Sequence, residues 1–250
     1  MTELKSEEDI RRIRKAGQIV AACHKAISKR IAPGVTTMEI DRFAERFMLE
    51  RGATPAQKGY KGYPFAICAS VNDVVCHGFP DSVPLEEGDI VTIDMVADVD
   101  GWKADSAWTY AIGRSTSLTE KLLGTAKLAL YQGIKQALPG RRLGDIGHAV
   151  QQCADKVGFT VITSFVGHGI GRQIHEPPQV EHRGEAGWGQ RLKEGMVLTI
   201  EPILTFGRRS DIAIGQDGWT AKTNDGAWAA QFEHTIAITR DGPVILTEWS

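Results

Sequence analysis

The clearest indication of chemistry in this chain is a repeated pattern that ends on an acidic residue both times. Residues 85–94 read LEEGDIVTID, and residues 192–201 read LKEGMVLTIE. The first copy ends on Asp94 and the second on Glu201, 107 residues later. Two related halves that each deliver a carboxylate at a strand end can build one site between them. Because converging carboxylates repel one another unless a cation joins them, the pattern favours a metal site.

Asp105 adds a carboxylate from the same half. Asp100-Gly101 lies between two β-like runs and predicts a hairpin turn. With the turn there, Asp94 and Asp105 lie on facing strands, as opposite or diagonal neighbours on one face. Such a pair could also point into solvent as ordinary strand acids. The matching Glu201 in the second half favours the metal site instead.

Two histidines occur in the glycine-rich segment VGHGIGRQIHEPP, namely His168 and His175. We expect Gly167, Gly169 and Gly171 to let the backbone approach a ligand closely. His168 follows the apolar run VITSFV and is well placed as a ligand, although a loop hydrogen bond would explain a single such histidine equally well. The segment lacks the Gly-Lys-Ser/Thr ending of a phosphate loop.

The other histidines have simpler interpretations. His24 and His148 fall inside helical patterns, where surface positions or satisfied hydrogen-bond partners are expected. His182 lies in a polar, glycine-rich stretch that predicts a loop. His234 directly follows Glu233, so the two side chains should point to opposite faces of a strand. None of these four histidines is predicted to be a ligand.

Cys76 and His77 are adjacent, which raises the possibility of a cysteine nucleophile with a histidine base. Neighbours on an extended chain point apart, so this pair alone cannot form a catalytic dyad. All four cysteines lack C-x-x-C spacing and are interpreted as reduced thiols of a cytosolic protein.

A duplicated arrangement of elements must position these residues. Helices are predicted from Ser6 (with Asp9) to Pro33, from the capping box Thr36-x-x-Glu39 to Gly52, from Ser117-x-x-Glu120 to Pro139, and from Leu143 to Gly158. Strand-rich sequence follows each helix pair, at 65–71, 90–98 and 106–112, and again at 161–166, 196–201, 211–216 and 233–239. Two copies of helix–helix–sheet predict an α+β fold with pseudo-twofold symmetry and helices on one side of a curved sheet.

Composition excludes several classes of protein. Hydrophobic residues make up 42% and charged residues 24% of the 250 residues, as in ordinary globular proteins. A net charge of −2 implies no general affinity for nucleic acid or anionic membranes. No apolar run of about 18 residues predicts a transmembrane helix. The N-terminus has no apolar core typical of a secretory signal.

Five segments in this order and spacing resemble the type I methionine aminopeptidases: VCHGFP, IDMVADVDGWKADSA, GHGIGRQIHEPP, LTIEPIL and QFEHTIAI. The resemblance covers almost the whole chain. It implies the pita-bread fold, in a single catalytic domain over residues 1–250 with pseudo-symmetric halves of about 1–115 and 116–250. It also implies two divalent metal ions, for which one imidazole and four carboxylates suit cobalt, manganese, iron(II) or zinc.

Five metal ligands are implied position by position: Asp94, Asp105, His168, Glu201 and Glu233. Asp105 and Glu233 would bridge both metals. Asp94 would complete the coordination of one metal, and His168 with Glu201 that of the other. The nucleophile would be a water activated by the two metals.

The resemblance also assigns roles around the metals. Glu201 would double as a proton shuttle, while His77 and His175 would contact the scissile amide and stabilise the tetrahedral intermediate. The methionine side chain would lie against Tyr60, Tyr63, Cys68, His77 and Trp219, since aromatic rings pack well on a thioether. Without the metal ligands, ordinary packing would explain the aromatic residues.

The chain departs from the family at several positions. Ile174 stands where an aromatic residue is common, Gln57 where cysteine is common, and Ala104 where glycine is usual. Leu204-Thr205-Phe206 replaces a common Val-Asn-Ala run. These changes affect the shape of the pocket and not the ligands, so they bear on relative substrate rates.

The implied activity is removal of the initiator methionine from nascent proteins and peptides when the second residue is small. The alternatives are a proline-directed aminopeptidase or dipeptidase of the same fold, or a relative that has lost its metals and only binds a partner. We expect a cytoplasmic monomer that contacts the ribosome transiently. We expect no contact with a membrane. No N-terminal extension for ribosome docking is expected.

Overall fold

The computed structural model describes residues 2–249, and within them four α-helices are present. They are α1 (Glu7–Ile27), α2 (Thr37–Leu49), α3 (Ser117–Gln136) and α4 (Leu143–Asp155), and a short 3-10 helix spans Tyr60–Gly62. None of these helices has the length and apolar character needed to cross a membrane. The bounds of α1 to α4 confirm all four predicted helices, and the observed ends differ from the predicted ends by a few residues.

Capping explains where the helices begin. The Ser6 hydroxyl accepts from the Asp9 N–H while the Asp9 carboxylate accepts from the Ser6 N–H. Thr36 and Glu39 form the same reciprocal pair at the start of α2, as predicted. The predicted box at the start of α3 is wrong by one residue, because the capping residue is Thr116.

The strands are short except for one central hairpin. They are β1 (Thr54–Pro55), β2 (Cys68–Val71), β3 (Val74–Cys76), β4 (Ile90–Val99), β5 (Trp102–Ala111), β6 (Thr160–Val161), β7 (Gly167–Gly169), β8 (Glu176–Val180), β9 (Val197–Ile200), β10 (Ile203–Thr205), β11 (Ile212–Ile214), β12 (Ala221–Thr223), β13 (Ala229–Gln231), β14 (His234–Thr239) and β15 (Gly242–Ile245). The predicted strand at 161–166 is largely wrong, since only its first residue belongs to a strand.

The β4–β5 hairpin has the predicted turn. Val99 pairs with Trp102, and the two turn residues Asp100 and Gly101 both have positive φ, at 53° and 78°. This conformation matches the twist of the flanking strands and suits an Asp-Gly sequence. The hairpin therefore fixes the register of everything that β4 and β5 carry.

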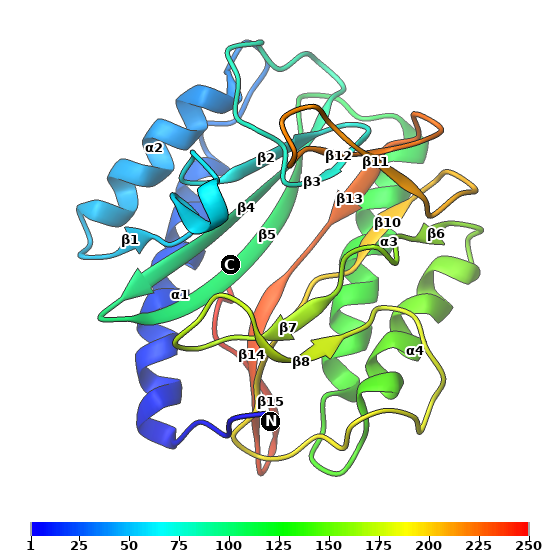
Figure 1. The fold of residues 1–250 in the computed structure, drawn as a ribbon. Helices are drawn as coiled ribbons and strands as arrows, with labels where there is room; N and C mark the ends of the chain where they lie inside the picture. The colour runs from blue at the N-terminus through cyan, green and yellow to red at the C-terminus, as the bar shows by residue number, and fades with distance from the viewer. Residues whose placement is uncertain (1, 250) are drawn as a thin grey trace.

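The two halves meet where β5 runs beside the segment that enters β14. The Ser106 hydroxyl donates to the Glu233 carbonyl at 2.8 Å, and the Glu233 N–H donates to the Ala107 carbonyl at 2.8 Å. The Asp105 N–H donates to the Thr235 hydroxyl at 3.0 Å. In the second half, β14 belongs to a five-stranded sheet with the order β15-β14-β9-β7-β8. Residues of both halves are thus held side by side (Figure 1).

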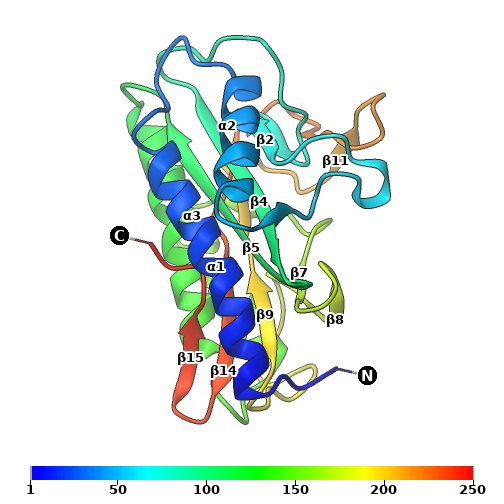
Figure 2. The ribbon, with the colours of Figure 1, turned by 90° about the vertical axis from the view of Figure 1, so that its left-hand side faces the viewer.

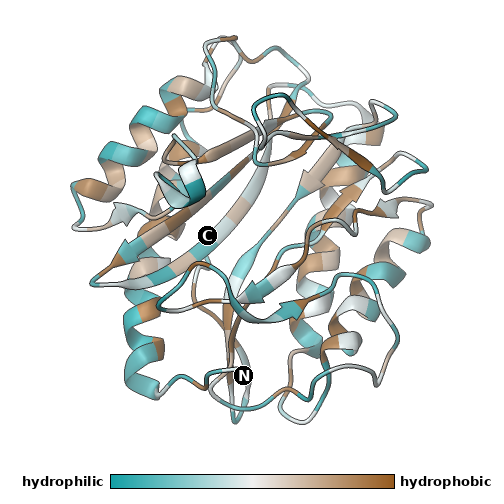
Figure 3. Ribbon diagram, in the orientation of Figure 1, coloured by the Kyte–Doolittle hydropathy of each residue, from teal (hydrophilic) through white to brown (hydrophobic). Residues whose placement is uncertain are grey.

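The helices lie on one side of the strands, as the repeated pattern predicts. In Figure 2, α1 and α3 run along one side of the strands, and β7 and β8 lie on the other. One apolar core joins α1 and α2 to β4, and another joins α3 and α4 to β9 and β14. Hydrophobic residues line β4, whereas the first turns of α1 are hydrophilic (Figure 3). The face of the strands opposite the helices is left for the site.

Candidate metal centre

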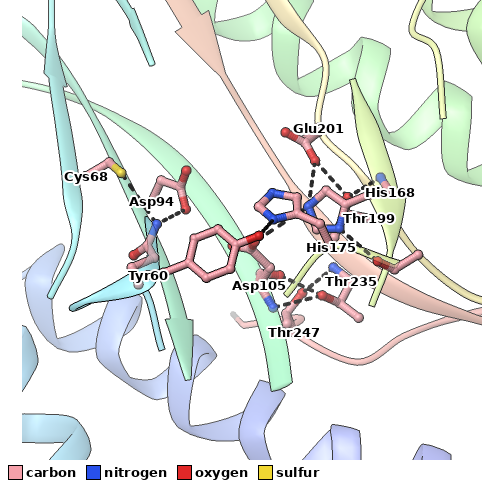
Figure 4. Close-up of polar contacts among 12 residues, drawn as sticks. Tyr60, Cys68, Asp94, Asp105, His168, His175, Thr199, Glu201, Thr235 and Thr247 are labelled. Atoms are coloured by element: carbon pink, nitrogen blue, oxygen red, sulfur yellow. Dashed lines mark hydrogen bonds and ion pairs between the residues drawn. The ribbon is translucent and has the colours of Figure 1, made fainter. Parts of the chain in front are cut away.

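Every residue that the sequence analysis assigned to the site lines one cavity of about 240 Å³. Two elements of the first half supply acids, because Asp94 lies on β4 and Asp105 on β5. Three places in the second half supply the rest: His168 in β7, Glu201 directly after β9, and Glu233 directly before β14. Figure 4 shows Asp94, Asp105, His168 and Glu201 around this cavity.

Strand register brings the two aspartates together. Asp94 pairs with Ala107, and Asp105 pairs with Val96, so the two acids are diagonal neighbours on the same face of the hairpin. The diagonal arrangement is one of the two that were predicted. At this spacing two carboxylates are within reach of each other and of a shared ligand.

His168 is held so that one ring nitrogen faces the acids. Its Nδ1 lies 2.9 Å from the Gly169 carbonyl, which can only accept, so Nδ1 carries the proton. Burial, and then the charge of His175, lowers the pKa of His168 to about 3 and keeps the ring neutral. The bare Nε2 lies 3.5 Å from Glu201 Oε1 and 3.9 Å from Asp105 Oδ2. A lone pair that faces carboxylates is what a metal ligand requires.

Glu201 is fixed by its neighbours. The Thr199 hydroxyl donates to Oε1 at 2.7 Å, and Gln231 Nε2 lies 3.4 Å from Oε2. The Thr199 hydroxyl also accepts from the His168 N–H at 2.9 Å. Thr199 thus orients two of the predicted ligands at once.

Burial of the acids raises their pKa values. Burial is the main cause for Asp94, at about 6, and for Glu201, at about 8. Burial and then the neighbouring carboxylates raise the pKa values of Asp105 and Glu233 well above the usual range. Without a cation, Glu201, Asp105 and Glu233 would hold protons at neutral pH that exposed acids would lose.

The arrangement fits a cation. One ligand atom each from Asp105, His168 and Glu233 lie within 4.8 Å of one another. Asp105 Oδ1 and Glu233 Oε1 are buried and have no hydrogen-bond partner among residues 2–249. Buried acceptors normally have a partner, and a divalent metal would provide one here.

His175 and His77 approach the cavity from different sides. The Tyr60 hydroxyl lies 2.8 Å from His175 Nδ1, and the rings of His168 and His175 are 4.3 Å apart. His77 has positive φ, and its ring packs edge-on against Phe165 at 5.2 Å. Burial, and then the charge of His175, lowers the pKa of His77 to about 4, so it is neutral.

Aromatic rings form the wall beyond the acids. Tyr63 packs edge-on against Trp219 at 5.1 Å, and its hydroxyl lies 3.0 Å from the carbonyls of Ile67 and Gly78. Because the hydroxyl is used there, the ring presents an apolar surface. Cys68 is buried beside it.

The glycines of the glycine-rich segment have a different role from the one predicted. A Cβ at Gly167 would meet the Thr199 carbonyl at 2.5 Å, and one at Gly169 would meet the Pro177 carbonyl at 2.4 Å. At Gly171 a Cβ would lie 2.6 Å from Lys5 Cε. These contacts are within the protein, so the glycines let neighbouring segments pack closely behind His168.

The simpler interpretations of the other histidines are confirmed for three of them. Buried His24 contacts the Tyr110 hydroxyl and the Ser106 carbonyl, and His148 contacts Gln152. His234 contacts the Thr247 hydroxyl and lies next to Trp108, away from the acids.

Cys76 is buried, and burial raises the pKa of its thiol well above the usual range. A protonated, buried thiol is not a nucleophile. The structure therefore gives no support to the cysteine nucleophile.

Sequence reasoning missed two residues that support the acids. His182 is in a loop as predicted, but it is buried, and its Nε2 accepts from the Glu201 N–H at 3.0 Å. Gln57 Nε2 lies 3.2 Å from Asp94 Oδ1 and 3.4 Å from Cys68 Sγ. Gln57 could have been found from the sequence, because it stands where cysteine is common in the family. Nothing in the sequence distinguished His182.

Comparisons with known proteins agree with this geometry. The sequence profile of metallopeptidase family M24 matches residues 11–240. The chain belongs to this family. It is 45% identical to methionine aminopeptidase 1 of Bacillus subtilis (strain 168) over 97% of this chain and 98% of that protein. It is 44% identical to methionine aminopeptidase A of a Synechocystis species, over 98% and 96% of the two chains.

Solved M24 structures confirm the pita-bread fold. A methionine aminopeptidase from Rickettsia prowazekii superposes with a TM-score of 0.97 at 40% identity, over 99% of this chain and all of that one. A prolidase from Pyrococcus furiosus superposes with a TM-score of 0.79 at 25% identity. The superposition covers 98% of this chain but only 65% of the prolidase. Within family M24 the chain therefore groups with the methionine aminopeptidases.

Proposed function

We propose that the protein removes the N-terminal methionine from peptides and nascent proteins whose second residue is small. The observation that carries this proposal is one cavity in which four carboxylates and a neutral histidine lie beside an aromatic pocket. The relatives that match the chain over nearly its full length are named methionine aminopeptidases, and this supports the same activity here.

Two divalent metal ions would be held by Asp94, Asp105, His168, Glu201 and Glu233. When bound, such ions lower the pKa of a water molecule toward neutrality and polarise the peptide carbonyl. The oxygen-rich ligand set with one imidazole suits cobalt, manganese, iron(II) or zinc, and no thiolate is among the ligands.

Glu201 is the candidate proton shuttle. Its carboxylate lines the cavity, where an oxygen within hydrogen-bond reach of the reacting water can accept a proton and return it. Hydrogen bonds from Thr199 and Gln231 hold its two oxygens, so the proton would be exchanged at a fixed position.

His175 and His77 are the candidate donors to the scissile amide. If the Tyr60 hydroxyl donates to His175 Nδ1, the other ring nitrogen carries a proton that can point at the developing oxyanion. His77 is neutral and also has one N–H to donate. Donors placed in this way stabilise the transition state more than the bound substrate.

The substrate's methionine side chain would lie against Tyr60, Tyr63, Cys68, His77 and Trp219. Its thioether can pack on the Tyr63 and Trp219 rings. The second residue would lie between the two histidines, where Tyr60 against His175 limits the room. A small second residue is therefore preferred.

Two other functions are less well supported. A proline-directed enzyme is not favoured, because the prolidase shares only 25% identity and is longer than this chain. A metal-free binding protein is not favoured either, since all five ligand positions keep a metal-binding side chain.

The setting of the enzyme is part of the proposal. Residues 1–250 would act as one catalytic domain, in a monomer that contacts the ribosome transiently in the cytoplasm. Four free, buried cysteines support a reducing compartment.

The test is a peptide-cleavage assay with manganese-loaded protein. Met-Ala-Ser should be cleaved after methionine, Met-Lys-Ser poorly, and N-acetylated Met-Ala-Ser not at all. Equal rates on the first two peptides would contradict the proposed preference. Cleavage of Ala-Pro but not Met-Ala would favour the proline-directed alternative.

A further inference from the structure

Lys5 is a buried charge outside the cavity, in the segment before α1. Its side chain is 1% exposed, and its Nζ lies 2.8 Å from Glu176 Oε2 and 2.7 Å from Glu3 Oε2. Burial alone would lower the pKa of Lys5, but hydrogen bonds with Glu176 and Glu3 outweigh it and leave the pKa above its usual value. The Lys5 N–H donates to the Gly195 carbonyl at 2.7 Å, which fixes this segment near the start of β9.

Glu176 connects Lys5 to the loop that carries His175. Glu176 directly follows His175 and begins β8. Its Oε1 accepts from the Gln173 N–H at 2.9 Å, while its Oε2 binds Lys5. The carboxylate therefore closes the turn around His175, and Lys5 holds that carboxylate in place. The stem of Lys5 also packs directly on Gly171, where a Cβ would be 2.6 Å from Cε.

The other contacts of this loop act farther from His175. The Lys103 N–H donates to the Gly171 carbonyl at 2.9 Å, and Lys103 Nζ donates to the Arg172 carbonyl at 2.9 Å. The Arg172 guanidinium stacks on Trp102 at 4.1 Å. These contacts fix the beginning of the loop, before the residues next to His175.

His175 itself is an exposed residue on the open side of the cavity. Tyr60 and His168 contact its ring, Ile174 before it is buried in the apolar core, and Glu176 after it pairs with Gly169 of β7. An ion pair with almost no access to water, fixed to the adjacent residue, is a stronger restraint than an exposed pair, which is usually weak. A charge from 171 positions earlier in the chain therefore binds the residue next to His175.

We propose that Lys5 is a positioning residue for His175: through its ion pair with Glu176 it holds the loop so that the imidazole reaches the scissile amide. Lys5 does not touch substrate or metal ligands. This inference rests on the proposed function, because it assigns His175 to the peptide bond.

The first test compares Lys5→Met with the wild-type chain, both manganese-loaded, on Met-Ala-Ser. A misplacement of about 1 Å can cost about a hundredfold in rate, and partial loss of restraint should lower kcat by about five- to tenfold. We expect KM to stay within about twofold of wild type and bound metal to be unchanged. Glu3→Gln is the matched control, since it removes the exposed partner of Lys5 and keeps Glu176; its kcat should match wild type.

The second test separates positioning from general stability. In a His175→Ala background, Lys5→Met should lower kcat no further, because the residue through which it acts is gone. If the two changes multiply, Lys5 acts on something other than His175 and the proposal is wrong. Glu176→Gln, which weakens the same ion pair without changing shape, should reproduce the effect and serves if Lys5→Met does not fold.

The outcomes distinguish this inference from the proposed function. An inactive wild-type chain with both metals bound would refute methionine removal itself. An active wild-type chain whose Lys5→Met and Glu176→Gln variants keep their kcat would refute only the role of Lys5.

Discussion

Removing the metal should make stability depend on pH in a direction set by the buried acids. Glu201, Asp105 and Glu233 have raised pKa values in the metal-free fold. The folded state then binds more protons than the unfolded state, so their contribution to stability is lost as pH rises toward the folded pKa. Metal-free protein should therefore become less stable between pH 6.5 and 8.0.

The range from pH 6.5 to 8.0 is chosen because the buried histidines change stability with pH in the opposite direction from the acids. Burial lowers the pKa values of His24 to about 4 and of His168, His182 and His234 to about 3. A buried neutral histidine adds stability as pH rises, and most of this gain is made below the unfolded value of about 6.5. Above that pH the combined loss from the three acids exceeds the small gain that the histidines still make.

The magnitude can be worked out from Glu201 alone. Its folded pKa of about 8 leaves about 1.5 units between pH 6.5 and the loss of its proton, which at about 1.4 kcal/mol per unit is about 2 kcal/mol. Asp105 and Glu233 act in the same direction. With a urea slope of about 2 kcal/mol per molar, the unfolding midpoint should fall by about 1 M.

The assay is urea unfolding followed by circular dichroism at pH 6.5 and 8.0. Chelator-treated protein should show the fall, and manganese-loaded protein should show much less, since the metals keep the acids ionised at both pH values. Glu201→Gln should make the metal-free dependence shallower. A metal-free midpoint that is constant or rises with pH would refute the view that these acids share a buried site.

Four other substitutions test individual roles. Asp105→Asn should lower metal occupancy while the fold is kept, because a bridging ligand serves both ions; elemental analysis and circular dichroism would check this, and normal metal content would contradict the bridging assignment. His175→Ala should keep both metals and lose about a hundred- to thousandfold in turnover, the usual cost of removing a transition-state donor, about 2.7–4 kcal/mol. His168→Ala should lose metal instead. If His175→Ala loses metal and His168→Ala keeps it, the roles of the two histidines are assigned the wrong way round. Tyr60→Phe should lower kcat by about two- to tenfold, since one hydrogen bond contributes about 0.5–1.5 kcal/mol; unchanged kcat would mean that the hydroxyl does not orient His175.

Local rules were sufficient for one part of the site. Asp100-Gly101 specifies a tight turn, the turn fixes the register of β4 and β5, and the register puts Asp94 and Asp105 on one face. The repeated pattern that pairs Asp94 with Glu201 indicates that the second half supplies a matching carboxylate; the expected strand end is found for Glu201, whereas Asp94 lies inside β4. These are short-range constraints, so the sequence is enough to predict them.

Contacts that join distant segments could not be predicted in this way. His182 accepts a hydrogen bond from the Glu201 N–H, although it lies in a loop 19 residues earlier in the chain. No hydrophobic periodicity or turn sequence connects the two residues. Lys5 and Glu176 are 171 residues apart. The glycines of the glycine-rich segment were noticed, but their purpose depends on which backbone lies opposite them, at Thr199 and Pro177. Only the assembled fold supplies that information.

The most direct test of the account is the release of methionine from Met-Ala-Ser by chelator-treated protein as manganese or cobalt is added, with bound metal counted by elemental analysis. The five-ligand site predicts no turnover without metal, and activity that rises as bound metal approaches two ions per chain. Full turnover by protein shown to contain no metal would contradict the assignment of the buried acids as metal ligands.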